Sequence, residues 1–406
     1  MDMEKTEHRR AATTLRGDAP GTTRTARETE AQEHGGVDLL IVAANARSLI
    51  ANRGDLIREI RRRGQSVAAA VPRKDYLPEV EELGIPIYPF DLGRTGVNPI
   101  EDLRTTLALT QLMRRLRPEA VFSYTVKPVV YGSLAARWAG VPRVYAMITG
   151  LGHAFTTESW RTRVLRTISS SLYRTALARC DRVFFQNPDD LQDFLDRGVL
   201  PDTERVVRIN GSGVDVDRFA EHPLPEGDPL FLFVGRLLTE KGILEFVEAA
   251  RQVHAQHPNA RFVVVGPHNP DLPHTISAEQ VEAWKREGIV EFVGGVADVR
   301  PWLQKASVFV LPSYREGTPR SVLEAMSVGR PIITTDAPGC RETVVDGENG
   351  FLVPPRTSAP LAEAMQRLVD HPDLLSRMAR SSRERVEAKY EVSQVNLVIL
   401  RSMELA

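Results

Sequence analysis

The chain has 406 residues, of which 42% are hydrophobic and 26% charged, so it is long enough for two domains and resembles an ordinary soluble protein in composition. Its net charge of −1 gives no indication of nucleic-acid binding, although residues 37–220 carry 26 Lys and Arg against 21 Asp and Glu, and residues 221–406 carry 20 against 25. No stretch reaches the roughly 18 apolar residues of a spanning helix, and the polar N-terminus predicts no secretory signal. Cys180 and Cys340 lie far apart without metal-type spacing, which indicates free thiols in a cytoplasmic protein.

Residues 1–36 are expected to form a disordered tail. They are rich in Thr, Arg, Glu and Gly, and such a segment cannot bury enough apolar surface to offset the entropy that ordering costs. Order is expected to begin at Val37, because the apolar run at 38–44 is typical of a parallel strand covered on both faces. In the first domain, 37–217, a helix follows this run, further strands are predicted at 66–71, 85–88, 120–124, 143–148, 182–185 and 206–209, and further helices at 100–117, 130–139, 161–179 and 188–197.

A proline-rich linker is expected around 218–228, where the apolar pattern breaks, and the alternation of strand and helix then restarts. The repeated alternation predicts two doubly wound parallel sheets, and hence two Rossmann-like α/β domains that face each other across a cleft. The second domain is expected over 228–385, followed by a last helix within 390–406. Its strands are predicted at 230–234, 261–265, 290–293, 307–311, 331–334 and 351–353, and its helices at 241–257, 277–287, 299–305, 319–328, 361–370 and 374–389.

The stretch 309–324 is interpreted as a buried strand, a sharp polar turn and a helix that begins at Pro319. Proline suits the first helical position, because its fixed φ fits the helix and the N–H that it lacks would be unpaired there. The turn therefore directs a helix N-terminus out of the carboxyl end of a strand, an arrangement that suits a phosphate. Glu316 and Glu324 frame this site, and sugar hydroxyls are their expected partners. Taken singly, Glu316 also fits an exposed turn residue, and Glu324 fits half of an i,i+4 pair with Arg320.

This run, continued by Ala-Met-Ser-Val-Gly-Arg-Pro at 325–331, resembles the signature of family 4 glycosyltransferases, which are retaining enzymes of the two-domain GT-B fold. The resemblance implies that Glu324 binds the ribose hydroxyls of a nucleotide sugar and that Glu316 contacts the transferred sugar. It also implies that the last helix crosses back onto the first domain. The backbone N–H groups implied to face the phosphates are those of Thr318, Arg320 and Ser321.

A second segment, 232–243, ends a strand and opens a helix at the edge where doubly wound folds place ligands. Arg236 offers a planar fork of donors and Lys241 a compact charge, which suits a diphosphate, although a solvated basic turn has the same composition. The family resemblance implies that Gly235-Arg236 and Lys241-Gly242 bind the leaving diphosphate, with Gly235 allowing close approach of the backbone. Residues implied in the same way to line the nucleotide cleft are Gly266 and, around the base, Val293 and Gly294.

In the first domain, 124–128 and 149–155 each follow a predicted strand and are expected to open toward the cleft. The second of these turns, together with Gly211–Asp215, resembles a narrower bacterial subgroup whose members add sugars to undecaprenyl-diphosphate-linked acceptors. His153 is either a structural histidine or a catalytic contact to substrate, beside the expected catalytic groups Glu316, Arg236 and Lys241. The candidate acceptor contacts are Asn45, Lys127 and Thr149.

The segment 160–180 holds five arginines and no acidic residue. It fits a basic amphipathic helix at the inner membrane surface, and equally a solvated helix that packs on its own domain.

The predicted function is a retaining glycosyltransferase that moves a hexose or N-acetylhexosamine from a UDP-sugar to a lipid-diphosphate-linked saccharide in surface-glycan synthesis. No metal or other cofactor is expected, because Asp215-Val-Asp217 belongs to the family segment before the linker and no other cluster has metal-ligand spacing. Two alternatives stay open: a nucleotide-sugar 2-epimerase on the same fold, and a non-catalytic subunit of a glycan-assembly complex.

Overall fold

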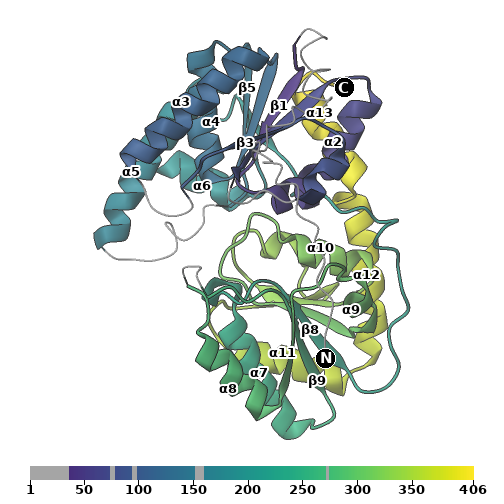
Figure 1. Cartoon of the computed structure of the whole chain (residues 1–406). Helices are drawn as coiled ribbons and strands as arrows, with labels where there is room; N and C mark the ends of the chain where they lie inside the picture. The colour runs from purple at the N-terminus through teal and green to yellow at the C-terminus, as the bar shows by residue number, and fades with distance from the viewer. Residues whose placement is uncertain (1–35, 74–77, 94–97, 151–159, 271–273) are drawn as a thin grey trace, which may run out of the picture.

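The computed structural model describes residues 36–73, 78–93, 98–150, 160–270 and 274–406, so the expected tail lies almost wholly outside the described residues. Two parallel sheets form two domains, which lie one above the other in Figure 1 with helices on both faces of each sheet. The chain forms the two sheets in turn, first the sheet of the domain coloured from purple to teal and then the sheet of the domain coloured mainly green.

The first sheet has seven strands in the order β3-β2-β1-β4-β5-β6-β7. Its strand β1 is fully buried, and its side chains alternate between two core layers, with Leu39 and Ile41 in one and Leu40 and Val42 in the other. A parallel strand covered by helices on both faces has no solvent side, which is why the run is apolar throughout. The strands are β1 Leu39–Val42, β2 Val67–Pro72, β3 Ile87–Phe90, β4 Ala120–Tyr124, β5 Arg143–Ile148, β6 Arg182–Phe185 and β7 Val206–Arg208, and the helices are α2 Ala46–Arg62, α3 Pro99–Leu116, α4 Val126–Ala139, α5 Trp160–Leu177 and α6 Pro188–Asp196, with a 3-10 turn at Pro78–Leu83.

The second sheet repeats this order with six strands, β10-β9-β8-β11-β12-β13. In both sheets the strand order reverses beside the first strand, and doubly wound folds bind ligands outside the carboxyl ends of the strands at that point. The strands are β8 Leu230–Val234, β9 Arg261–Val265, β10 Val290–Gly294, β11 Val308–Leu311, β12 Ile332–Thr335 and β13 Gly350–Val353, and the helices are α7 Ile243–Gln256, α8 Ala278–Glu287, α9 Arg300–Lys305, α10 Arg320–Ser327, α11 Ala359–Asp370, α12 Asp373–Lys389 and α13 Val392–Ser402, with 3-10 turns at Thr239–Lys241 and Arg341–Thr343.

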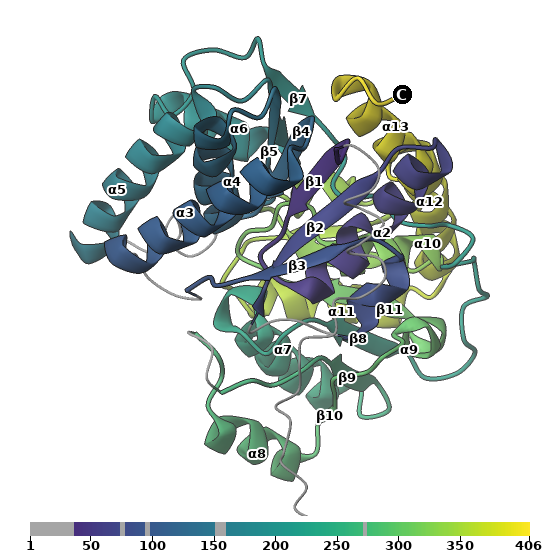
Figure 2. The same cartoon turned by 45° about the horizontal axis from the view of Figure 1, so that its top comes forward.

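The last helix returns to the first domain. Helix α12 packs on α10 of the second domain, whereas α13 packs on α2 of the first, beside which Figure 2 shows it. Val395, Ile399 and Leu400 join the core of the first domain, and the hydroxyl of Tyr145 donates to the carbonyl of Met403 at 2.9 Å. The predicted fold class, two Rossmann-like domains with a C-terminal helix that crosses back, is confirmed.

The structure corrects two predicted helix starts. Helix α4 begins at Val126 and not at residue 130, because Pro128 is compatible with the first turn of a helix. The helix predicted from Lys241 is instead a short 3-10 turn followed by α7, because Gly242 between them takes a left-handed φ of 74°. Among the helices of the described residues, none is both long and apolar enough to cross a membrane.

Candidate active site

A pocket of about 290 Å³ lies between the two domains, where the carboxyl ends of strands from both sheets meet. It brings together side chains that follow β4, β5 and β6 of the first sheet with side chains that follow β8 and β11 of the second. The lining residues are Asn52, Tyr124, Thr125, Thr149, Gln186 and Ser212 from the first domain, and Lys241, Glu316, Gly317, Thr318, Pro319, Arg320 and Ser321 from the second.

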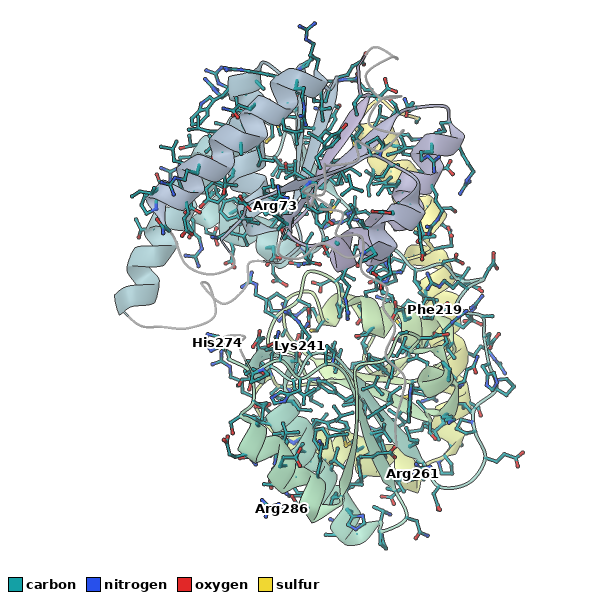
Figure 3. All side chains as sticks on the ribbon, viewed as in Figure 1. Arg73, Phe219, Lys241, Arg261, His274 and Arg286 are labelled. Atoms are coloured by element: carbon teal, nitrogen blue, oxygen red, sulfur yellow. The ribbon has the colours of Figure 1, made fainter. Side chains whose placement is uncertain are left out.

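Lys241 and Glu316, which two separate motifs indicated, form an ion pair in this pocket. Lys241 Nζ contacts Glu316 Oε1, and Ser313 Oγ donates a hydrogen bond to the same oxygen at 2.6 Å. Lys241 is held at the pocket by a tight turn behind it, because Gly242 lies against the carbonyl of Pro312, where a side chain would collide. Figure 3 shows Lys241 on the side of the second domain that faces the first. A cation and a carboxylate therefore meet at the carboxyl ends of β8 and β11.

Helix α10 presents its N-terminus to the pocket, and the structure corrects its predicted start by one residue. Pro319 is the N-cap, with an extended ψ of 111°, so the helix begins at Arg320. No side chain of the described residues caps this end, and its first N–H groups can therefore bind a ligand, assisted by the positive end of the helix dipole. Arg320 Nε donates to Glu324 Oε1 at 2.9 Å, but the two side chains are only 19% and 14% exposed, so this is no ordinary surface pair. Burial raises the pKa of Glu324, and the charge of Arg320 opposes that shift.

A second pocket, of about 170 Å³, contains the three residues expected near the nucleotide, Gly266, Val293 and Gly294. Gly266 has no room for a side chain, because a Cβ atom there would collide with the carbonyl oxygen of Gly235. The backbone at Gly235 was expected to approach the ligand closely. In the structure, the close approach is between the backbone of Gly235 and the backbone of Gly266. Arg236 lines neither pocket, and its side chain is exposed.

The first domain binds the loop that carries Glu316 through charged side chains at the start of α6. Arg315 donates from Nε and Nη2 to Asp190 Oδ1 at 3.0 and 2.5 Å, and from Nη2 to Asp193 Oδ2 at 2.6 Å. The side chain of Asp190 is fully buried, and that of Arg315 is 14% exposed. Burial raises the pKa of Asp190, and the charge of Arg315 opposes that shift. These ion pairs connect the two domains directly beside the catalytic candidate Glu316.

The backbone of the same loop also lies tightly against the first domain. Asn187 Nδ2 donates to the carbonyl of Gly317 at 2.8 Å, and a side chain at Gly317 would collide with the carbonyl of Thr149. A further ion pair between the domains joins Arg341 Nη1 to Asp189 Oδ2 at 2.9 Å. The position of Glu316 therefore depends on both domains.

The predicted acceptor contacts divide into one that lines the pocket and two that do not. Thr149 lines it. Asn45 instead caps α2, where its side chain accepts from the N–H of Ser48 at 2.7 Å. Lys127 Nζ donates to the carbonyl of Gly93 at 2.7 Å and lies 3.6 Å from Asp102, so a partner in its own domain holds it. His153 lies outside the described residues.

Several lining residues were not among the sequence candidates. Tyr124 and Thr125 belong to the segment 124–128 that was expected to open toward the cleft, although neither was named as a contact. Gln186 was missed, and its place just after the carboxyl end of β6 is the same signal. Ser212 lies in the segment Gly211–Asp215 that resembles the bacterial subgroup, but it was not named as a contact. Asn52 carries no comparable signal, because a polar residue on a helix is ordinary. Among the described residues, the first-domain side chains that line the pocket are all polar and uncharged.

Arg53 lies behind this wall with only 1% of its surface exposed. Its guanidinium stacks over the ring of Tyr124 at 5.1 Å, and Nη2 contacts Met147 Sδ at 2.6 Å. Its hydrogen-bond partners among the described residues are the carbonyl of Asn52 and Met147 Sδ, neither of them a carboxylate, and burial lowers its pKa to about 10. An arginine on an amphipathic helix is normally read as exposed, so the sequence held no signal for this buried cation.

The described residues contain no group of three or more His, Cys, Asp or Glu that could hold a metal ion. Asp215 of the Asp-Val-Asp sequence is used by its own turn, since its Oδ1 accepts from the N–H groups of Asp217 and Arg218 at 3.0 and 2.8 Å.

Comparison with known proteins matches each domain to a family model. Residues 52–211 match the glycosyl transferase 4-like domain, and residues 228–371 match the glycosyl transferases group 1 model. The chain is 26% identical over 343 residues to N,N'-diacetylbacillosaminyl-diphospho-undecaprenol alpha-1,3-N-acetylgalactosaminyltransferase of Campylobacter jejuni, a match that covers 81% of this chain and 89% of the relative. It is also 26% identical over 305 residues to UDP-Gal:alpha-D-GlcNAc-diphosphoundecaprenol alpha-1,3-galactosyltransferase of Escherichia coli, with 72% and 76% covered.

Solved structures agree on the fold. Anabaena Alr3699/HepE in complex with UDP superposes with a TM-score of 0.72 at 17% identity, covering 91% of this chain and all of that one. Sucrose-phosphate synthase from Thermosynechococcus elongatus superposes with a TM-score of 0.73 at 19% identity, covering 89% and 97%.

Proposed function

This chain belongs to the family 4 glycosyltransferases of the GT-B fold, and from this membership we propose that it transfers a hexose or N-acetylhexosamine from a UDP-sugar to a lipid-diphosphate-linked saccharide, with retention of anomeric configuration. The names of the Campylobacter and Escherichia relatives specify undecaprenyl-diphosphate-linked sugars, and the Anabaena structure contains UDP. The observation that carries the proposal is the Lys241–Glu316 pair facing the uncapped end of α10 in one pocket between the domains.

The donor diphosphate occupies the second-domain side of this pocket. Lys241 and the first N–H groups of α10 supply positive charge where the leaving group develops negative charge, which is electrostatic catalysis by groups already in place. Arg236 adds its guanidinium from the exposed turn after β8, because an exposed arginine can reorient toward a diphosphate without breaking an ion pair. The uracil ring occupies the second pocket, where Val293 and Gly294 face its edge.

Glu316 has one oxygen to offer the transferred sugar. Its Oε1 already binds Lys241 and Ser313, while Oε2 has no partner among the described residues and accepts from a sugar hydroxyl. The departing diphosphate takes the proton of the acceptor hydroxyl as the new glycosidic bond forms on the same face. Closure of the domains around the pocket excludes water from this step.

The acceptor's lipid requires a membrane contact, and α3 offers a surface for it. Ile100, Leu103 and Leu107 lie at i, i+3 and i+7 on one face of α3 and are 65%, 52% and 46% exposed. Arg104 is exposed on the same helix. Aliphatic side chains flanked by arginine suit the headgroup region of an anionic bilayer.

An ion pair links α3 to the helix that follows the pocket residue Thr125. Asp102 of α3 pairs with Lys127 of α4, two residues after the pocket residue Thr125. The other candidate for this contact was the segment 160–180, where the side chains of residues 160–166 and 168 lie outside the described residues.

A donor screen followed by a product assay tests the proposal. Thermal shift with UDP-sugars and GDP-sugars identifies the donor, because a ligand that binds only the folded state raises its stability. UDP release is then measured with and without an undecaprenyl-diphosphate-linked saccharide, for the wild type, for Lys241→Ala and for the control Arg251→Ala, whose ion pair with Glu287 lies outside both pockets. Release that needs the acceptor and is lost only in Lys241→Ala is the expected result. Conversion of the donor alone would show an epimerase, and binding without turnover would show a silent subunit.

A further inference from the structure

Thr125 has a backbone conformation that threonine does not normally adopt. It is the whole connection between β4, which ends at Tyr124, and α4, which begins at Val126. Its φ of 70° and ψ of 163° fall in a region that is essentially restricted to glycine, and a side chain branched at Cβ is especially unfavourable there. A single residue that must turn a strand directly into a helix has little choice of dihedral angles.

The hydroxyl of Thr125 is also unsatisfied. A threonine at a helix N-cap ordinarily accepts a hydrogen bond from an N–H of the first turn. Here no such bond forms, and Oγ1 is buried without a partner among the described residues. Buried polar atoms without a partner are uncommon and unfavourable. Glycine at this position would remove both the strain and the unpaired hydroxyl.

The neighbouring residues hold Thr125 in this state. The hydroxyl of Tyr124 is 3.0 Å from Ser48 Oγ, and the N–H of Val129 donates to the carbonyl of Thr125 at 2.9 Å. The ring of Tyr124 is in turn covered by the guanidinium of Arg53. Strain of this kind persists only where the surroundings determine the conformation, and such residues cluster at ligand sites.

Thr125 lines the pocket between the domains, on the wall opposite Lys241 and Glu316. The first-domain side chains around it are neutral hydrogen-bonding groups, such as those of Asn52, Thr149 and Gln186. Neutral groups of this kind match the hydroxyls of a sugar better than they match a phosphate, whose charge the second domain is equipped to receive.

We propose that Thr125 Oγ1 binds a hydroxyl of the terminal sugar of the acceptor and so orients the acceptor for attack. The inference rests on the proposed glycosyl transfer and assigns this contact to a residue that lines the pocket and whose hydroxyl has no partner among the described residues. The cost of leaving this hydroxyl unpaired in the free protein is recovered when the sugar supplies the missing partner.

Three substitutions at Thr125 and one control test the assignment. Thr125→Ala and Thr125→Gly remove the hydroxyl and are expected to raise the acceptor KM about tenfold, as for the loss of one hydrogen bond, with donor KM unchanged. Thr125→Ser keeps the hydroxyl and is expected to stay within about threefold of the wild type. Thr125→Gly is also expected to unfold at a higher temperature, because it relieves the strain. The control Arg117→Gly relieves a left-handed φ of 48° at the end of α3, and is expected to stabilise the protein without altering transfer.

The possible outcomes separate the two proposals. Equal acceptor KM for wild type and Thr125→Ala overturns the assignment of Thr125 and leaves glycosyl transfer intact. A lower unfolding temperature for Thr125→Gly, with transfer lost in proportion to folded protein, shows a structural role and also overturns it. Absence of transfer by the wild type, with donor bound, refutes the proposed function itself.

Discussion

Replacement of Arg315 by methionine tests whether the contact between the domains sets the position of Glu316. Methionine retains much of the length and apolar surface of the side chain, but it removes the three hydrogen bonds to Asp190 and Asp193. Asp190 is then left as a fully buried carboxylate, whose remaining side-chain partner is Asn187 Nδ2 at 3.0 Å.

The expected loss of stability is large for a single substitution. Removing one partner of a buried ion pair costs about 3–5 kcal/mol. We expect Arg315→Met to cost about 3 kcal/mol, at the lower end of this range, because the hydrogen bond from Asn187 still partly satisfies Asp190. This corresponds to roughly a 150-fold change in the folding equilibrium. Burial already raises the pKa of Asp190, and loss of Arg315 raises it further. A raised pKa in the folded state favours the protonated carboxyl, so the loss of stability should be greatest at neutral pH and should diminish as the pH falls toward that raised pKa.

The assay combines urea unfolding with steady-state transfer. We expect Arg315→Met to lower kcat at least about tenfold, because small displacements of a reacting group are costly, while donor KM changes less than about threefold. The control Arg251→Met removes a two-point pair with Glu287 at 2.6 and 2.7 Å that is partly exposed, and it should cost below about 1 kcal/mol with no change in kcat. The reasoning is refuted if Arg315→Met unfolds at the wild-type urea concentration, or if both variants lose the same activity.

Three further predictions concern other parts of the chain. Glu316→Gln should lower kcat about a hundredfold with little change in unfolding, and normal kcat in a UDP-release assay would remove Glu316 from the site. Replacing Ile100, Leu103 and Leu107 together by serine should weaken sedimentation with phosphatidylglycerol vesicles at least about tenfold. The control Leu244→Ser, at a leucine of α7 that is 41% exposed, should not weaken it. Equal loss in both variants would contradict the membrane contact proposed for α3. Cys180 and Cys340 are free thiols, and burial raises the pKa of each to about 12. A thiol reagent at pH 8 should therefore label neither cysteine in the native protein and both in urea. Rapid labelling of the native protein would show that the thiols are not buried.

Local sequence was sufficient for the architecture. Strands such as β1 and β8 were readable because parallel strands covered on both faces must be apolar at every position. The location of Lys241 and Glu316 near the pocket could be predicted from the sequence as well, because each follows the carboxyl end of a strand, where the fold places ligands. Predicted helix starts were wrong by one to four residues near Pro128, Gly242 and Pro319. Proline and glycine are each found both just inside and just outside a helix end, so their presence does not fix the boundary.

Only the tertiary structure determined which side chains meet. Nothing local distinguishes Asn45, which caps its own helix, from Thr149, which lines the pocket. The pairing of Arg315 with Asp190 joins residues 125 positions apart and depends on how one domain faces the other. The strain at Thr125 arises because two elements fixed by their own packing leave one residue to connect them. Periodicity and motif reflect the burial and position of each segment separately, whereas a site between two domains depends on the packing of both.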